Sequence, residues 1–146
     1  MKRILKLLSA MLTISLLLTI PVQAQSMENA RASAFFAAYG TDLEKISSTS
    51  FRIWFDVDAN LTTMQELGVS EIVVYRSSNK SNWTPVKTYT KDVYSNMIDE
   101  NSVSYVAYLS YSSAMPGYYY TACVTFYAKN SSGCGYIDEY TEIIKM

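Results

Sequence analysis

The sequence predicts an all-β protein, an antiparallel β-sandwich of about seven strands, on the basis of three observations. Short runs alternate between apolar and polar residues with the period of two that is typical of half-buried strands. Clusters of Ser, Asn and Gly separate these runs at the spacing expected of a sandwich or barrel. Thirteen tyrosines, beside only five glycines and three prolines, favour strands over helices or disorder.

The N-terminus has the organisation of a secretory signal peptide. Lys2, Arg3 and Lys6 precede an uncharged run over residues 7–20, and a Pro-Val-Gln-Ala segment over residues 21–24 follows. Its valine and alanine occupy the two positions before a cleavage site that must be small, so we expect residues 1–24 to be removed. The run is shorter than the roughly 20 residues that cross a bilayer, which makes a permanent anchor the lesser alternative. We therefore expect a secreted, extracellular protein that begins at Gln25 and has no membrane attachment after cleavage.

Residues 25–146 are long enough for one β-sandwich domain with a single hydrophobic core. They carry nine basic and 13 acidic side chains, a net charge of −4, with no run of Lys or Arg. Such a chain lacks the electrostatic footprint of a nucleic-acid binder. It has no histidine, which excludes Ser-His-Asp and Cys-His catalysis and removes the commonest zinc ligand. We expect no cofactor and no catalytic residue.

The first half of the domain contains two expected strands and one expected helical turn. The Ala-rich segment 26–39 suits a short helix or an edge strand, and we favour a strand over 35–39. In the run 51–57, alternation places four apolar residues on one face and Trp54 on the other. Thr63 and Glu66 have capping-box spacing and Gly68 could end a helix, which predicts a single helical turn over 63–68.

Five further strands are expected in the second half, over residues 71–77, 83–90, 103–111, 118–128 and 136–144. In the fourth of these, alternation separates Tyr120, Ala122, Val124 and Phe126 from the residues between them. We expect Tyr120 to face the core, with Tyr119 and Tyr127 on the outer face. The last run places Tyr136 and Tyr140 together on one side.

Two segments resemble fibronectin type III domains. Residues 115–124, with the sequence Met-Pro-Gly-Tyr-Tyr-Tyr-Thr-Ala-Cys-Val, look like the turn into the sixth strand of such a domain. Tyr120 matches the tyrosine corner, whose hydroxyl bonds back to the chain upstream. Residues 71–77, followed by Asn82, Trp83 and Thr84, resemble the third strand and its continuation. The resemblance implies an immunoglobulin-like (fibronectin type III-like) antiparallel sandwich, although the core tryptophan usual in the second strand would be Trp54, which alternation turns outward.

The whole mature chain, including the Tyr118-Tyr119-Tyr120 run, is also similar to an uncharacterised family of small secreted proteins from Gram-positive bacteria. This resemblance implies no activity.

Three candidate chemical sites have simpler interpretations. Residues 56–60 open like a calcium loop, but Leu61 and Leu67 stand where that loop needs Gly and a bidentate Glu. The pairs 99–100 and 138–139 are adjacent carboxylates, which point to opposite faces of a strand and cannot flank one sugar. Cys123 and Cys134 flank the expected turn over 130–133, and that hairpin keeps them too far apart for a disulfide.

The remaining candidate is an aromatic outer face that could bind a partner. We expect its residues to be Tyr119, Tyr127, Tyr136, Tyr140, Ile72 and Val74. Rigid aromatic side chains supply contact area at low entropic cost, and large exposed apolar patches mark interaction sites, although tyrosines also simply suit strands. The sequence thus favours a non-enzymatic module that recognises a protein or a cell-surface glycan. The alternatives are a secreted carboxylate-dependent hydrolase and a structural or self-associating protein.

Overall fold

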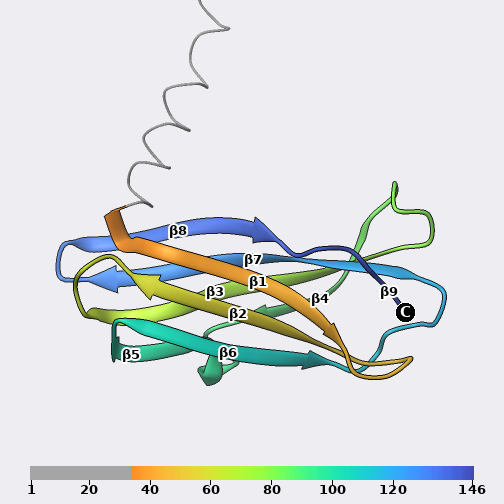
Figure 1. The fold of residues 1–146 in the computed structure, drawn as a ribbon, viewed down its shortest axis with the longest axis horizontal. Coiled ribbons are helices and arrows are strands. Elements are labelled where there is room, and N and C mark those ends of the chain that lie inside the picture. Colours follow the sequence, from red (N-terminus) through yellow and green to blue (C-terminus); the bar gives the residue numbers. More distant parts are fainter. Residues whose placement is uncertain (1–33) are drawn as a thin grey trace, which may run out of the picture. The chain divides into compact units, whose positions relative to one another are not determined.

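The computed structural model describes residues 34–146, which form two antiparallel β-sheets (Figure 1). The expected signal peptide over residues 1–24 lies outside the described residues. The smaller sheet has the order β1-β2-β6, formed by Phe36–Lys45, Phe51–Ala59 and Ser104–Tyr111. The larger sheet has the order β4-β3-β7-β8, formed by Thr84–Thr90, Met64–Ser77, Tyr119–Asn130 and Gly133–Tyr140.

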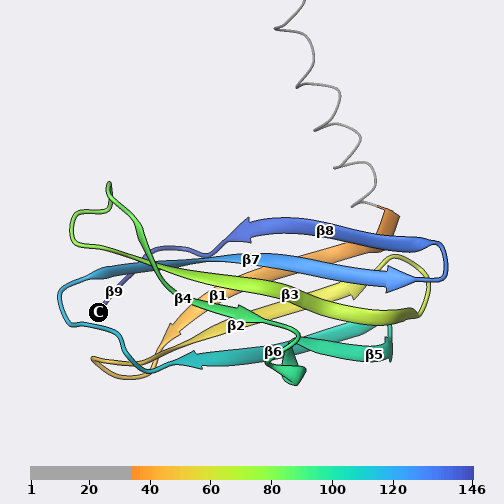
Figure 2. The ribbon, with the colours of Figure 1, turned by 180° about the vertical axis from the view of Figure 1, so that it is seen from behind.

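Three short elements complete the described fold. β5 (Ile98–Ser102) pairs with β3, and β9 (Ile144–Lys145) pairs with β7. A 3-10 turn, η1 (Ser95–Met97), leads into β5. Figure 1 views the molecule from the side of β1 and β2, and Figure 2 shows the opposite side, where β3, β4, β7 and β8 lie in front. Every expected strand is present, and the model confirms an all-β sandwich of antiparallel sheets.

The core lies between the two sheets because one face of each central strand is apolar. In β2, Phe51, Ile53, Phe55 and Val57 are each at most 1% exposed, as the alternation predicts. In β7, Tyr120, Ala122, Val124 and Phe126 are fully buried. The rings of Phe51 and Tyr120 lie 5.4 Å apart and join the two sheets. Burial of aromatic and branched side chains from both sheets is the main stabilising contribution to this fold.

The expected helical turn over residues 63–68 is wrong, because this segment is the first part of β3. Met64 and Leu67 are buried and three residues apart, a spacing that resembles a helix in the sequence. In the structure, the segment is hydrogen-bonded on both sides, to β5 and to β7. These two ladders outweigh a local capping preference, which stabilises a helix only weakly.

Gly68 does not end a helix but allows a close approach of two backbones. Its φ is +153°, and a Cβ at this position would lie 2.1 Å from the carbonyl oxygen of Met97. No other residue fits this position without displacing η1. The sequence pattern suggested that Gly68 ends a helix. In the structure, Gly68 is instead the position on β3 against which the turn before β5 packs.

Candidate functional site

The outer face of the larger sheet is the candidate functional site, and the structure revises which residues form it. Ile72 and Val74 were expected there, but both are fully buried. Ile72 pairs directly with Val124, and Val74 pairs with Ala122. Directly paired residues of neighbouring strands share a face of the sheet, so both side chains point into the core. In this part of β3 the residues that alternate on both faces are apolar. The sequence of the strand alone therefore does not show which face enters the core.

Tyr127 was also expected to be exposed, and this prediction is wrong, since only 5% of the residue is accessible. The side chain does lie on the outer face, but its neighbours cover it. The Lys91 ammonium lies 4.4 Å from the centre of its ring, and the Tyr136 ring lies at 5.1 Å. Burial raises the pKa of the Tyr127 hydroxyl, while the charge of Lys91 acts in the opposite direction.

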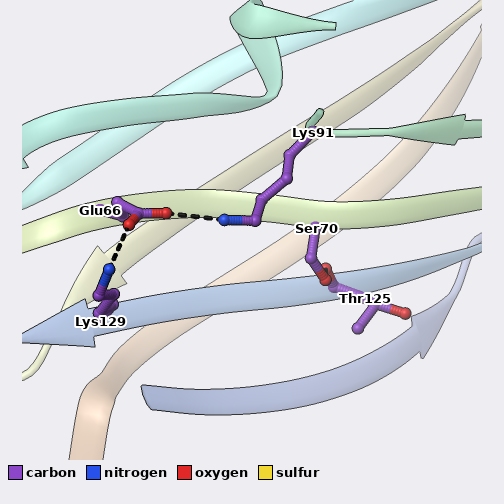
Figure 3. A network of polar contacts seen from close by, with 5 residues as sticks. All are labelled: Glu66, Ser70, Lys91, Thr125 and Lys129. Atoms are coloured by element: carbon purple, nitrogen blue, oxygen red, sulfur yellow. Dashed lines mark hydrogen bonds and ion pairs between the residues drawn. The ribbon is translucent and has the colours of Figure 1, made fainter. Parts of the chain in front are cut away.

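Lys91, which lies over Tyr127, belongs to an ion-pair network. Figure 3 shows this network of Glu66, Lys91 and Lys129. Glu66 on β3 accepts hydrogen bonds from Lys91 and from Lys129, each at 2.8 Å. These contacts lower the pKa of Glu66, with Lys129 the larger cause. Beside the network, the β3–β7 register shifts between Val69 and Glu71, and the Ser70 hydroxyl donates to the carbonyl oxygen of Thr125 at 3.2 Å. The single carboxylate of Glu66 is therefore shared by two ammonium groups.

The other predicted tyrosines are accessible to different extents. Tyr136 is 49% exposed and Tyr140 is 64% exposed, as expected for an outer face. Tyr119 is half-buried. Its ring lies beside the ammonium groups of Lys80 and Lys145, which are 4.8 Å and 5.4 Å from the ring centre. Tyr140 also lines a hollow in the described part of the chain.

That hollow is an open groove of about 390 Å³, which we call the aromatic groove. Its lining residues are Tyr75, Trp83, Thr121, Tyr140, Thr141 and Ile143. The volume lies within the range of small-molecule sites in proteins, roughly 300–1,000 Å³. Its walls come from four places in the chain, namely β3, the residue before β4, the start of β7, and β8 with the segment that follows it. The groove therefore exists only in the folded sheet.

Two threonines give the aromatic groove a fixed base. The Thr121 hydroxyl donates to the carbonyl oxygen of Thr141 at 3.0 Å, and the Thr141 hydroxyl accepts from the Ala122 amide at 2.9 Å. Both threonines are buried. Their hydroxyls are committed to the protein, so aromatic rings and the phenol hydroxyls of the walls are what a ligand would meet.

The walls are aromatic and uncharged. The rings of Tyr75 and Tyr140 lie 6.5 Å apart with an interplanar angle of 36°. The thiol of Cys123 lies beside Tyr140, and this contact is the main cause of the raised pKa of the Tyr140 hydroxyl. Burial raises the pKa of the Cys123 thiol itself, while the Tyr140 contact lowers it. Both groups are therefore in their neutral forms near pH 7.

Sequence reasoning missed two walls of the groove, Tyr75 and Trp83. The position of Tyr75 could have been inferred from β7, whose inner face was predicted correctly. Residues paired directly across two strands share a face, so the inner face of β7 determines which residues of β3 point outward. Tyr75 pairs with Thr121, an outward position of β7. Trp83 precedes β4 after a loop, and no periodicity in the sequence places it over the sheet.

The smaller sheet has a second aromatic surface whose polar groups are already paired. Trp54 points outward, as the alternation predicts, and its indole N–H donates to Glu44 at 2.8 Å. Its ring lies 4.7 Å from that of Tyr108, and Arg52 covers Tyr108 at 4.6 Å while also pairing with Glu44. The hydrogen bond from Trp54 is the main cause of the lowered pKa of Glu44.

The acidic residues singled out in the sequence lie on three separate strands, β2, β5 and β8. Asp56 and Asp58 lie on β2, in extended chain rather than in a calcium-type loop. No group of three side chains suited to a metal ion occurs in this part of the chain. Glu139 is distinctive because one carboxylate oxygen is buried without a hydrogen-bond partner. Burial, and next the charge of Asp56, raise its pKa.

The two cysteines are free thiols, as the hairpin register predicts. Cys123 pairs with Tyr140, whereas Cys134 pairs with Lys129 on the facing strand. The two positions are therefore six residues apart along the ladder, about 20 Å at the usual rise of a strand. A disulfide requires Cα atoms within roughly 7 Å. None of the helical segments within residues 34–146 has the length and hydropathy of a bilayer-spanning helix.

Comparison with known proteins shows similarity to solved structures alone. No protein-family model matches the chain, and no curated protein matches it. The chain is similar to the X-ray structure of Northeast Structural Genomics Consortium target SoR45, with 8% sequence identity and a TM-score of 0.37. That alignment covers 79% of this chain and 87% of the other. We therefore derive the function from the geometry of the groove.

Proposed function

We propose that the protein is a secreted, non-enzymatic, immunoglobulin-like (fibronectin type III-like) module that binds a cell-surface glycan in the aromatic groove. The observation that carries this proposal is the groove itself, with Tyr75, Trp83 and Tyr140 around an open space on an exposed sheet. Ligand sites in proteins are mostly apolar concavities with a few polar groups that fix orientation. The tyrosine hydroxyls provide such groups here.

The strand order supports the immunoglobulin-like assignment. Without the short β5 and β9, three strands form one sheet and four form the other. A seven-strand division of this kind belongs to the smaller immunoglobulin-like sandwiches. The hydroxyl of Tyr120 also contacts the chain five residues upstream, as a tyrosine corner does. The modules of this architecture serve many functions, so the activity has to be argued from the groove.

A glycan fits the groove because of the chemistry of its walls. One face of a sugar ring carries C–H groups that pack against the faces of Tyr and Trp rings, and its edge carries hydroxyls that bond to phenols. The Tyr75 and Tyr140 rings lie 6.5 Å apart and are tilted by 36° to each other, so both can contact one face of such a ring. The groove is open rather than enclosed, so one or two residues of a longer chain could enter it.

The lining favours binding over hydrolysis. A carboxylate-dependent glycosidase places two carboxyl groups on either side of the scissile bond, about 5–10 Å apart. The lining of the groove contains no Asp or Glu. Glu139, whose raised pKa is typical of a general acid, lies on β8 opposite Val124, a residue of the core face, and does not line the groove. The groove therefore offers contacts to a sugar without groups that would cleave it.

The test is to screen the purified protein against a glycan array and to measure the affinity of each hit by calorimetry. Trp83→Ala and Tyr140→Ala should each weaken binding at least tenfold, because truncating a central aromatic contact removes most of the local binding energy. Tyr108→Ala is the matched control, since it removes an exposed tyrosine from the opposite sheet. Absence of any glycan ligand, or binding that survives both groove substitutions, would refute the proposal. Capture of a protein partner at the same groove, without glycan, would refute it equally.

A further inference from the structure

The aromatic groove has a positively charged neighbour, formed by Lys80 and Lys145, which both lie close to the ring of Tyr119. The two ammonium groups lie 4.8 Å and 5.4 Å from the centre of the Tyr119 ring. Lys80 belongs to the loop between β3 and β4, whereas Lys145 is on β9 and pairs with Tyr119 in the ladder. A third ammonium, that of Lys45, donates to the backbone carbonyl of Lys145 at 3.2 Å. The fold thus gathers three cations from separate parts of the chain.

Neither Lys80 nor Lys145 forms an ion pair with a carboxylate among residues 34–146. The ion pairs in the described part of the chain involve Arg52, Lys91 and Lys129 instead. The contrast with Lys91 is informative, because Lys91 also lies over an outer tyrosine, Tyr127, at 4.4 Å. Glu66 forms an ion pair with Lys91, so the charge of that lysine is already compensated within the protein. No glutamate occupies the equivalent position beside Lys80 and Lys145 in the described part of the chain. The charges of these two lysines are therefore available to a ligand.

Tyr119, Lys80 and Lys145 each lie close in the chain to a residue that lines the groove. Tyr119 is two residues before Thr121 on the same face of β7, about 7 Å away along a strand. Lys145 is likewise two residues after Ile143, and Lys80 lies in the same loop as Trp83. Thr121, Ile143 and Trp83 all line the groove. A ligand that occupies the groove and extends toward Tyr119 therefore reaches both ammonium groups.

We infer that the groove binds an acidic saccharide, with a sugar ring against Trp83 and Tyr140 and a negative group of the same chain between Lys80 and Lys145. This inference rests on the proposed function and adds the charge of the ligand. A uronate carboxylate and a sulfate ester share the necessary chemistry, a compact anion attached to a sugar ring. Two ammonium groups that are unpaired in the free protein bind such an anion without first breaking an internal ion pair.

The experiment uses a panel of uronate and sulfated oligosaccharides, each beside its methyl-esterified or desulfated form. These pairs have the same rings and differ in charge. At low salt, the charged member of at least one pair should bind about tenfold more tightly, and added salt should reduce the difference. Which of the two series responds identifies the anion.

The matched variants separate charge from shape. Lys80→Gln and Lys145→Gln should each weaken binding of the acidic form about threefold, and the double variant about tenfold, the usual scale for exposed charge contacts. Binding of the neutral form should not change. Lys87→Gln removes an exposed lysine of β4 that does not contact Tyr119, so it should leave both affinities intact.

The possible failures are distinguishable. Equal affinity for the charged and neutral forms, with binding still dependent on Trp83, would overturn the acidic-ligand inference and leave glycan binding intact. Preference for the acidic form that persists in the double lysine variant would also overturn it. Absence of binding to every oligosaccharide would overturn both this inference and the proposed function.

Discussion

Tyr120 and Met115 are joined by a hydrogen bond of 2.8 Å, in which the backbone amide of Met115 donates to the tyrosine hydroxyl. Tyr120 is fully buried and packs against Phe51 of the opposite sheet. One side chain therefore fixes the turn before β7 and fills the space between the sheets.

These two roles predict two different losses. Tyr120→Phe keeps the ring but leaves the Met115 amide unpaired, which should cost about 1–3 kcal/mol of unfolding free energy. Tyr120→Ala also removes the ring and should cost about 3–5 kcal/mol. Denaturant unfolding measures both, with Tyr108→Phe on the exposed face as control. A Tyr120→Phe protein as stable as the parent would mean that the hydrogen bond does not stabilise the turn.

Tyr127 and Tyr119 should respond differently to truncation, although both lie on the outer face of β7. Tyr127→Ala should cost about 2–3 kcal/mol, because the ring is covered by Lys91 and Tyr136. Tyr119→Ala should cost about 1 kcal/mol or less, as is usual for partly exposed positions. Unfolding midpoints compare the two variants directly. Equal losses would show that the cover over Tyr127 does not exclude water.

Glu66→Gln tests the ion-pair network and should destabilise the protein by about 1 kcal/mol near pH 7, since it removes two partly exposed pairs. The pKa of Glu66 is lowered in the folded protein, so its contribution is present above the ordinary value of 4.5 and is lost as the pH falls through the folded pKa. The parent and variant should therefore converge in stability toward pH 2–3. A constant difference across the acidic range would argue against the network.

Glu139→Gln should have the opposite sign and stabilise the protein at pH 7 by up to about 1 kcal/mol. Burial raises the pKa of Glu139, so its ionised form is the unfavourable one in the folded state. The penalty is absent below the ordinary value of 4.5 and develops as the pH rises through the folded pKa. Thermal unfolding at pH 7 and at pH 3.5 should show a gain only at the higher pH. A loss of stability at pH 7 would mean that the carboxylate has a stabilising partner.

Export can be tested separately from binding. The proposed cleavage after Ala24 predicts that protein recovered from culture medium begins at Gln25, because Val22 and Ala24 satisfy the small-residue rule at that point. Intact-mass measurement gives the N-terminus directly. A mass that includes residues 1–24 would contradict cleavage, and protein found only inside the cell would contradict export.

The sequence by itself determined the positions of the seven main strands and the faces of β2 and β7, although it did not reveal β5 or the first part of β3. In both strands one set of alternate residues is apolar and the other set is more polar, so burial of one face fixes the orientation of the whole strand. The buried alternate residues are Phe51, Ile53, Phe55 and Val57 in β2, and Tyr120, Ala122, Val124 and Phe126 in β7. The hairpin that separates Cys123 from Cys134 follows from local turn chemistry, since residues 130–133 favour a turn over any continuation of the strand.

The tertiary structure alone decided the inner face of β3 and the cover over Tyr127. Both faces of β3 near Ile72 are apolar, and only pairing with Val124 selects the one that enters the core. Tyr127 is buried by Lys91, which is distant in the sequence and is held there by Glu66. The aromatic groove likewise joins Tyr75, Trp83 and Tyr140 through the register of three strands. Alternation describes one strand at a time, whereas these features depend on which strands become neighbours.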